Sequence, residues 1–183
     1  MMPGRKLEIF ILAGGLSTRM GRDKARVRVG RRSMLRHVRD AASQLRVPVR
    51  VIRRDAIARC GPLGGIFTAL KRTRAETIFL LACDMPFISP QLLRAMLRQF
   101  DRKTTALFAQ EDARAGFPIL LRCEAAESIV SAQIAAKEFS LQSLAKKIRA
   151  KTFLPPPALV RQLINLNTPE DLQRNSIPSA TTK

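Results

Sequence analysis

Residues 6–24 read KLEIFILAGGLSTRMGRDK, an apolar run that passes directly into a loop rich in glycine and basic residues. The run contains aromatic and β-branched side chains and stops at a pair of glycines, which is the pattern of a short buried strand. The loop adds Ser17, Arg19 and Lys24 to the backbone amides of its glycines. Main-chain N–H groups and basic side chains together make anion sites. The stretch therefore predicts a strand that leads into a phosphate-binding loop, with a plain strand-to-helix turn as the alternative.

Strand and helix patterns alternate along the rest of the chain. Short apolar runs bounded by turn residues predict further strands over 47–52, 76–85, 104–110, 117–122, 150–155 and 159–167. Apolar residues at helical spacing predict helices over 33–45, 61–72, 89–100, 124–136, 140–149 and 168–174, with Ser33, Ser89 and Thr168 as N-caps. This order is typical of an α/β fold with a mostly parallel sheet. We expect residues 1–175 to form one domain and residues 176–183 to form a disordered tail.

The composition limits the classes of protein to which the chain can belong. No apolar run approaches the ~20 residues that span a membrane. The three cysteines are widely spaced, and the single histidine, His37, is expected on a helix surface. A disulfide framework, a zinc site and a histidine-dependent triad are therefore disfavoured. We expect a cytoplasmic protein with no membrane contact.

The formal net charge of +19 calls for an anionic partner. Nucleotides, acidic metabolites and nucleic acids all meet that requirement, and arginine is spread through nearly every segment. The chain has no Trp and no Tyr, and its Phe residues lie in apolar runs, so no stacking platform for nucleic acid is evident. A basic nucleic-acid-binding protein stays as an alternative of another class.

The loop at residues 12–24 differs from the two commonest phosphate-binding loops. It lacks the Gly-Lys-Ser/Thr ending of a Walker A motif and the spacing of the G-x-G-x-x-G dinucleotide motif. It resembles instead the signature loop of nucleotidyltransferases, which transfer a nucleoside monophosphate from a triphosphate. Among these it is most similar to the molybdenum cofactor guanylyltransferase family, which joins GMP to molybdopterin. The pairs Gly14-Gly15 and Asp23-Lys24 favour this branch over the related cytidylyltransferases.

Three further stretches match the same family in the same order. GPLGGI at 61–66 follows Asp55 by six residues. LLACDMP ends a strand with Asp84, and NLNTPEDL spans 165–172. Taken alone, these stretches also suit a tight helix entry, a capping aspartate and a capped helix. A carboxylate at the end of a buried strand is costly unless it is paired, hydrogen-bonded or bound to a metal, and Mg²⁺ takes carboxylate oxygens together with phosphates. Asp84 is therefore the candidate metal ligand.

The resemblance implies a Rossmann-like three-layer α/β/α sandwich of the nucleotidyltransferase type. It implies transfer of GMP from GTP to the terminal phosphate of molybdopterin, with Mg²⁺ as cofactor and pyrophosphate as the second product. The catalytic roles would fall to Lys24, Asp84 and Arg19. The nucleotide would contact Leu12, Ala13, Gly14, Gly15, Ser17, Lys24, Asp55, Gly61, Pro62, Leu63, Gly64 and Asp84. Asn165 and Asn167 would lie near the metal and the acceptor.

The chain departs from the family pattern between its first helix and Asp55, where there is room for one strand only. The family usually has a further strand and loop there, with an asparagine that helps to hold the nucleotide, so Arg53 or Arg54 would have to replace it. Base selectivity and the acceptor are therefore open. A cytidylyltransferase, or a nucleotidyltransferase for a different phosphorylated acceptor, is the alternative. A non-catalytic nucleotide-binding protein is another, against which Lys24 and Asp84 argue.

Overall fold

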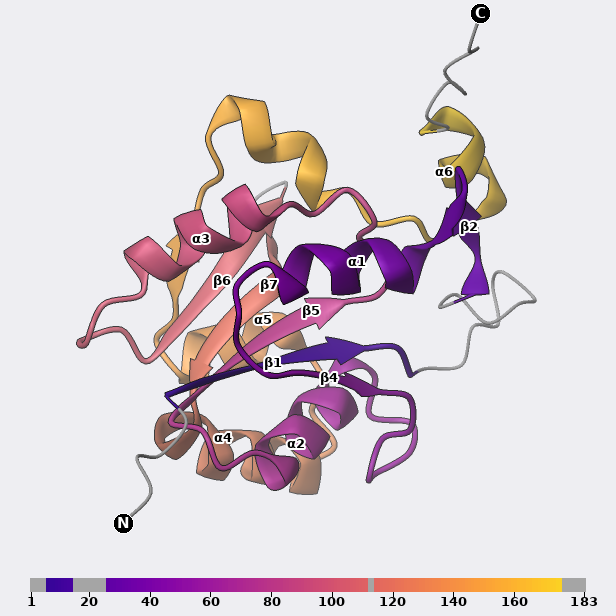
Figure 1. Ribbon diagram of the computed structural model, residues 1–183. Coiled ribbons are helices and arrows are strands. Elements are labelled where there is room, and N and C mark those ends of the chain that lie inside the picture. The colour runs from indigo at the N-terminus through magenta and orange to yellow at the C-terminus, as the bar shows by residue number, and fades with distance from the viewer. Residues whose placement is uncertain (1–5, 15–25, 112–113, 176–183) are drawn as a thin grey trace, which may run out of the picture.

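A six-stranded sheet forms the centre of the computed structural model, which describes residues 6–14, 26–111 and 114–175 (Figure 1). The strands follow the order β4 (Val49–Ile52), β1 (Leu7–Leu12), β5 (Thr77–Ala82), β7 (Arg114–Arg122), β6 (Ala106–Glu111) and β8 (Lys151–Phe153). β1 pairs in parallel with β4 and β5, and β6 pairs in parallel with β8. β7 alone runs antiparallel to both of its neighbours, β5 and β6. The prediction of a mostly parallel sheet is confirmed.

Helices cover both faces of this sheet (Figure 1). One face carries α1 (Met34–Ser43), α3 (Pro90–Gln99) and the 3₁₀ helix η2 (Pro157–Leu163). The other face carries α2 (Pro62–Arg72), α4 (Cys123–Ala135) and α5 (Leu141–Lys147). Successive strand residues point to opposite faces, so Ile9 and Ile11 join the apolar cluster on the α1 side, whereas Phe10 joins the cluster on the α2 side. The predicted three-layer α/β/α sandwich is confirmed.

Glu8 interrupts the apolar pattern of β1 and is nevertheless buried, with 1% of its side chain exposed. Its carboxylate accepts a hydrogen bond from Thr73 Oγ1 at 2.8 Å and pairs with Arg50 Nε at 2.6 Å. A buried carboxylate persists where such partners replace its water. Because Arg50 belongs to β4 and Thr73 follows α2, these two contacts of Glu8 join the edge strand β4 and the end of α2 to β1.

Serine and threonine caps begin four of the helices, Ser140 of α5 among them. The side-chain oxygens of Ser33, Ser89 and Thr168 each accept a hydrogen bond from the backbone N–H three residues further on. They start α1, α3 and α6 (Pro169–Arg174), respectively. All three N-caps predicted from the sequence are confirmed.

The strand predicted over residues 159–167 is wrong, because η2 occupies most of this range. Leu159 and Leu163 are buried and lie four residues apart, which is helical spacing and not the alternation of a strand. Prolines at 155–157 lead into the segment, and their fixed φ angles and missing N–H groups suit a helix start better than a ladder of hydrogen bonds.

A two-stranded hairpin, β2 (Arg28–Val29) and β3 (Arg32–Ser33), stands apart from the main sheet and was not predicted. Its turn contains Gly30 at a φ of 60°, a left-handed conformation that favours glycine. Each strand is only two residues long, so it is too short to show periodicity. A small apolar cluster holds the hairpin on the body of the protein, and its buried members are Val29, Met34 and Leu166.

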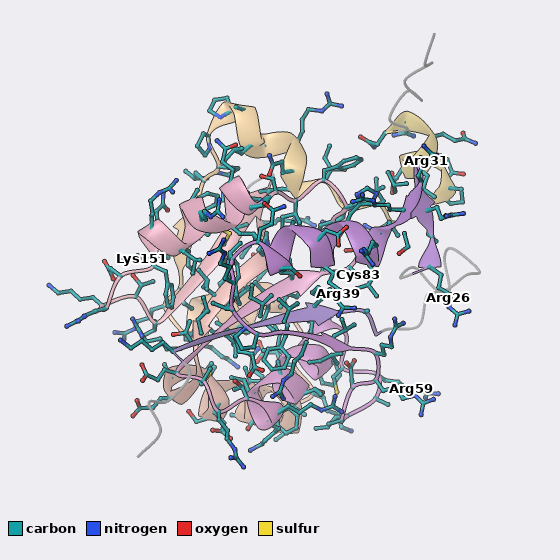
Figure 2. The ribbon with its side chains drawn as sticks, viewed as in Figure 1. Arg26, Arg31, Arg39, Arg59, Cys83 and Lys151 are labelled. Carbon is teal, nitrogen blue, oxygen red and sulfur yellow. The ribbon has the colours of Figure 1, made fainter. Side chains whose placement is uncertain are left out.

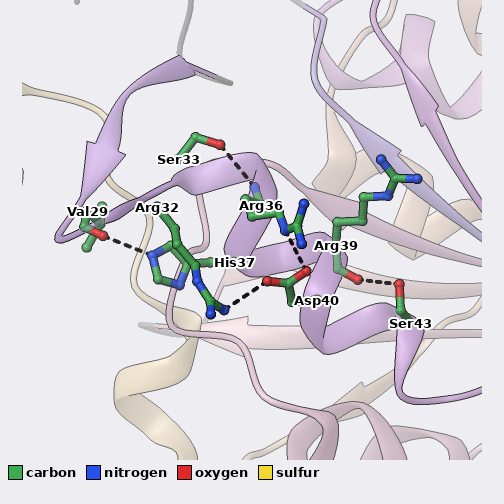
Figure 3. A network of polar contacts seen from close by, with 8 residues as sticks. All are labelled: Val29, Arg32, Ser33, Arg36, His37, Arg39, Asp40 and Ser43. Carbon is green, nitrogen blue, oxygen red and sulfur yellow. Dashed lines mark hydrogen bonds and ion pairs between the residues drawn. The ribbon is translucent and has the colours of Figure 1, made fainter.

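His37, which was expected on a helix surface, lies on α1 and is half-buried beneath the hairpin. Its Nε2 lies 2.9 Å from the carbonyl oxygen of Val29 (Figure 3). Asp40, one turn further along α1, pairs with Arg32 Nη1 at 3.0 Å and with Arg36 Nε at 2.9 Å. These contacts give the histidine a structural role between α1 and the hairpin.

No helix within the described ranges is long and apolar enough to cross a bilayer. The three cysteines, Cys60, Cys83 and Cys123, all lie within the described residues and form no disulfide there. The predicted tail at residues 176–183 lies outside the described residues.

Candidate functional site

A cavity of about 720 Å³ opens at the carboxyl edge of the parallel strands β4, β1 and β5. Ligands of open parallel sheets bind at this edge. Segments that are far apart in the sequence meet here. The predicted site residues that line the cavity are Leu12, Ala13, Gly14, Asp55, Gly61, Pro62, Asp84, Asn165 and Asn167.

Asp55 lies between two glycines that come from different elements. A Cβ atom on Gly14 would lie 3.4 Å from Asp55 Oδ1, and a Cβ atom on Gly64 would lie 3.1 Å from Asp55 Oδ2. The Gly64 Cβ atom would also lie only 2.9 Å from the carbonyl oxygen of Ile57. Glycine at both positions therefore lets the carboxylate fit between the end of β1 and the start of α2. Burial raises the pKa of the Asp55 carboxyl above its ordinary value.

The loop that carries Asp55 is anchored to α2 by one threonine. Thr68 Oγ1 accepts a hydrogen bond from the N–H of Ala56 at 2.8 Å and donates to the carbonyl oxygen of Gly64 at 2.7 Å. Gly61 precedes α2 with a φ of 55°, and Pro62 occupies the first turn of the helix. The amino end of α2 carries a partial positive charge, and its first turn holds no acidic side chain. This end is thus suited to an anionic or polar ligand in the cavity.

The asparagines reach the cavity from the far end of the chain. Leu166, which lies between Asn165 and Asn167, is fully buried, and its N–H donates to the carbonyl oxygen of Asp84 at 2.8 Å. In an extended segment, alternate side chains point to opposite sides. With Leu166 packed into the body of the protein, both asparagines line the cavity beside Asp84.

Asp171 holds this segment in place from the first turn of α6. Its Oδ2 accepts hydrogen bonds from the N–H groups of Asn167 and Thr168, each at 2.9 Å. Thr168 Oγ1 in turn accepts a hydrogen bond from the N–H of Asp171, which completes a capping box. The bond from Asn167, together with those from Thr168, holds the pKa of Asp171 below its ordinary value.

Two predicted nucleotide-binding residues lie elsewhere. Leu63 is fully buried in the apolar cluster on the α2 side, and buried Gly64 packs against Asp55, so neither lines the cavity. Leu63 turns into the apolar cluster and Gly64 faces the loop at Asp55 and Ile57, whereas Pro62 and Gly65, three residues apart on one side of the helix, line the cavity. The predicted residues Gly15, Ser17, Arg19 and Lys24 lie outside the described residues.

Sequence reasoning missed several residues of the cavity wall, which are Arg59, Gly65, Ala82, Cys83, Gly116, Phe117 and Leu141. Cys83 directly follows β5 and precedes Asp84; it is itself buried and also contributes to the wall. Gly65 belongs to the GPLGGI motif, so extending the predicted contacts by one residue would have found it. Phe117 and Leu141 carried no such signal, since each lies in an ordinary apolar pattern.

The oxygen donors of the cavity suit a hard cation. Two carboxylate residues, Asp55 and Asp84, and two amide residues, Asn165 and Asn167, line it together. The described residues contain no group of three or more His, Cys, Asp or Glu side chains suited to a metal ion. Mg²⁺ is commonly held by one or two carboxylates together with substrate phosphates. The donor set therefore fits Mg²⁺ that arrives with a nucleotide, and it does not fit a closed zinc site.

Comparison with known proteins places this geometry in a family. The model of the MobA-like NTP transferase domain matches residues 9–151. The chain belongs to this family. Asn165 and Asn167 lie beyond the matched range, although they line the same cavity of this MobA-like NTP transferase.

The relatives of this MobA-like NTP transferase carry one recurring name. Over 104 residues it is 41% identical to a "probable molybdenum cofactor guanylyltransferase" of Pelotomaculum thermopropionicum, an alignment that covers 49% of this chain and 50% of the relative. Over 184 residues it is 28% identical to a molybdenum cofactor guanylyltransferase of Rhizobium leguminosarum bv. trifolii, and this alignment covers 88% of each of the two chains. The molybdopterin-guanine dinucleotide biosynthesis protein A of Archaeoglobus fulgidus shares the fold, with a TM-score of 0.70 and 19% identity over 92% of this chain and 96% of that chain.

Proposed function

We propose that this protein transfers GMP from GTP to the terminal phosphate of molybdopterin and releases pyrophosphate. The observation that carries the proposal is that Gly14, Asp55 and Asp84 meet Asn165 and Asn167 in one cavity at the carboxyl edge of the sheet. The names of the family and of its relatives support the same reaction.

In this proposal the nucleotide lies across the end of β1. The backbone of Leu12, Ala13 and Gly14 approaches it closely, and Asp55 and the start of α2 hold its nucleoside end. The loop residues Gly15, Ser17, Arg19 and Lys24 surround the phosphates. Arg19 forks onto phosphate oxygens, and Lys24 stabilises the charge that develops on the α-phosphate.

The chemical step requires no side chain that acts as a base. An attacking phosphate monoester is already mostly dianionic at neutral pH, since its second pKa is about 6. One of its oxygens forms a bond to the α-phosphorus of GTP, the bond from that phosphorus to the bridging oxygen breaks, and pyrophosphate leaves. The chain's only histidine lies under the β2–β3 hairpin and does not line the cavity. Catalysis then consists of positioning and electrostatic stabilisation.

Asp84 is the residue proposed to hold Mg²⁺, with Asn165 and Asn167 close by. Bound Mg²⁺ would withdraw charge from the phosphate oxygens. The asparagine amides orient the acceptor phosphate beside Asp84. Three widely spaced cysteines that form no disulfide suit a reducing compartment, so we place the reaction in the cytoplasm.

The test is pyrophosphate release with Mg²⁺ and each of GTP, CTP, ATP and UTP, with and without molybdopterin. Release that requires both GTP and molybdopterin is the expected result. Preference for CTP would move the protein to the cytidylyl branch. No release with any nucleotide, together with salt-sensitive binding of DNA or RNA, would favour the nucleic-acid-binding alternative.

The variant Asp84→Asn tests the assigned role within the same assay. We expect it to lower kcat by at least about 100-fold, because the proposed metal ligand loses its charge. Asp101→Asn is the matched control, since Asp101 lies at the opposite edge of the sheet and contacts Thr104 and Lys151. Full turnover by Asp84→Asn would contradict the assignment.

A further inference from the structure

The cavity has two halves, and Asp84 lies between them. The register pairs Leu12 of β1 with Ile52 of β4 on one side and with Ala82 of β5 on the other. The loops after β1 and β4 therefore place Gly14 and Asp55 on one side of the end of β5. β7 is the neighbour of β5 on the other side. A ligand in the half of the cavity on the far side of Asp84 from Gly14 and Asp55 therefore contacts β7.

Phe117 is the aromatic residue of that second half. β7 runs antiparallel to β5, and their ladder ends with the pair Leu80 and Ile119. Residues of β7 that precede Ile119 therefore lie at the carboxyl edge of the parallel strands. Among the described residues, Phe117 is the one aromatic side chain that lines the cavity. It is half-buried and packs against both apolar clusters, so its ring has a fixed support.

An irregularity in the sheet coincides with this residue. Phe108 of β6 pairs with Ile119, but the next residue, Ala109, pairs with Gly116. Phe117 and the residue after it are therefore extra residues on β7. Bulges of this kind re-aim a side chain and are frequent beside active sites. The bulge takes Phe117 out of the regular alternation at the point where β7 begins to line the cavity.

The surroundings of Phe117 leave space for a flat ligand. A Cβ atom on Gly116 would meet nothing within 4 Å. Leu141, at the start of α5, adds an apolar side chain to the same wall. Gln142 fixes α5 to β7 by accepting from the N–H of Ala115 at 3.1 Å and donating to its carbonyl oxygen at 2.7 Å. The wall is therefore braced by two elements.

We propose that Phe117 is a specificity-determining residue, on which the fused heteroaromatic ring of the acceptor stacks. This inference rests on the proposed function, which requires a pterin-bearing acceptor in the half of the cavity beyond Asp84. A flat heteroaromatic ring gains from stacking on an aromatic face, and Leu141 closes the apolar wall beside it. The nucleotide, on the side of Gly14 and Asp55, makes no contact with this wall.

Phe117→Leu tests the assignment, because it keeps an apolar side chain and removes the ring. We expect the KM for molybdopterin to rise about tenfold, while the KM for GTP stays within about twofold. Phe117→Tyr keeps the ring and retains the wild-type KM for the acceptor. Phe67→Leu is the matched control, because Phe67 is also half-buried but lies on α2 under Lys71 and does not line the cavity.

A second variant covers the case in which Phe117→Leu fails to fold. Gly116→Val places a side chain in open space at a backbone conformation that valine tolerates, so we expect it to fold, bind GTP and exclude the acceptor. Binding of a simple fluorescent pterin is measured for every variant without turnover. Weaker pterin binding by Phe117→Leu supports the inference even if the wild type transfers no GMP. The absence of GMP transfer by the wild type would defeat the proposed function but not the role of Phe117. An unchanged acceptor KM and unchanged pterin binding in Phe117→Leu would overturn the inference.

Discussion

At the scale of single residues, Asp55 shows how the site and the stability of the fold oppose each other. Its carboxylate lies against Gly14 and Gly64, and burial raises its pKa above the ordinary value of 3.8. The folded protein therefore binds a proton at Asp55 more readily than the unfolded chain does. As pH rises through the window between the two pKa values, the free energy of unfolding falls. At neutral pH the charged carboxylate costs stability, and we attribute its retention to nucleotide binding.

We expect Asp55→Asn to have opposite effects on stability and on binding. The variant should have a higher Tm than the wild type at pH 7. The difference in Tm should vanish near pH 3, where residue 55 is uncharged in both proteins. Its KM for GTP should rise about tenfold, because a hydrogen bond to a charged group is lost. Thermal unfolding at the two pH values and initial-rate kinetics measure these effects. A lower Tm at pH 7, or an unchanged KM, would show that the carboxylate serves the fold.

At the scale of elements, the segment from Asn165 to α6 works as one unit. Leu166 fixes it to the body of the protein through its buried side chain and its backbone bond to Asp84. Asp171 fixes the following residues through the N–H groups of Asn167 and Thr168. The helix is short, and none of its residues is buried, so its main contribution lies in this cap. We infer that α6 positions Asn167.

Removal of the cap should therefore lower turnover although Asp171 does not line the cavity. We expect Asp171→Ala to lower kcat about tenfold, because small displacements of positioning residues are costly in catalysis. Glu170→Ala is the control, since it removes a charge from the same turn without a bond to Asn167. Because the pKa of Asp171 is lowered in the folded protein, the wild-type cap persists at neutral pH and is lost only as pH falls below 3.8. Equal activity of the two variants would refute a positioning role.

At the scale of the whole molecule, the excess positive charge gathers partly beside the cavity. A second hollow of about 590 Å³ is lined by Arg26, Arg28, Arg31, Arg32, Arg36 and Arg53, together with Ser33 and Leu35. The carbonyl oxygen of Arg53 would lie 3.0 Å from a Cβ atom on Gly14, so the hollow adjoins the half of the cavity that we propose for the nucleotide. Figure 2 shows Arg26, Arg31 and Arg59 extending from the same side of the molecule. The positive electrostatic field of these arginines attracts anionic substrates from a distance, and dissolved salt weakens this attraction.

Neutralising arginines of this hollow should slow the capture of GTP without changing the chemical step. We expect Arg28→Gln combined with Arg31→Gln to lower kcat/KM for GTP about threefold at low salt, with kcat unchanged and the difference gone near 0.5 M NaCl. The double variant Arg98→Gln and Arg102→Gln carries the same change in net charge away from the cavity and should behave as the wild type. Initial rates over a series of salt concentrations distinguish the two. Equal losses in both variants would mean that net charge alone matters.

Local patterns in the sequence determined much of the fold. The short apolar runs at residues 7–12 and 77–82 predicted the central strands, and Ser33, Ser89 and Thr168 predicted helix starts, because each of these signals depends on neighbours within a few residues. The order of these elements predicted the layered α/β fold, and a resemblance of motifs selected the candidate site. The carboxyl ends of parallel strands necessarily share one edge, so the convergence of Gly14 and Asp84 could also be expected.

Only the tertiary structure decided which distant segments complete the cavity. The antiparallel insertion of β7 beside β5 and the bulge at Phe117 place an aromatic wall there, and the return of Leu166 under the hairpin brings Asn165 and Asn167 to Asp84. Tertiary packing also explains why η2 forms over most of residues 159–167, where the sequence predicted a strand. These features depend on packing between segments that are far apart in the chain. A single sequence shows the local pattern of each segment, but it does not show which apolar faces of distant segments will pack together.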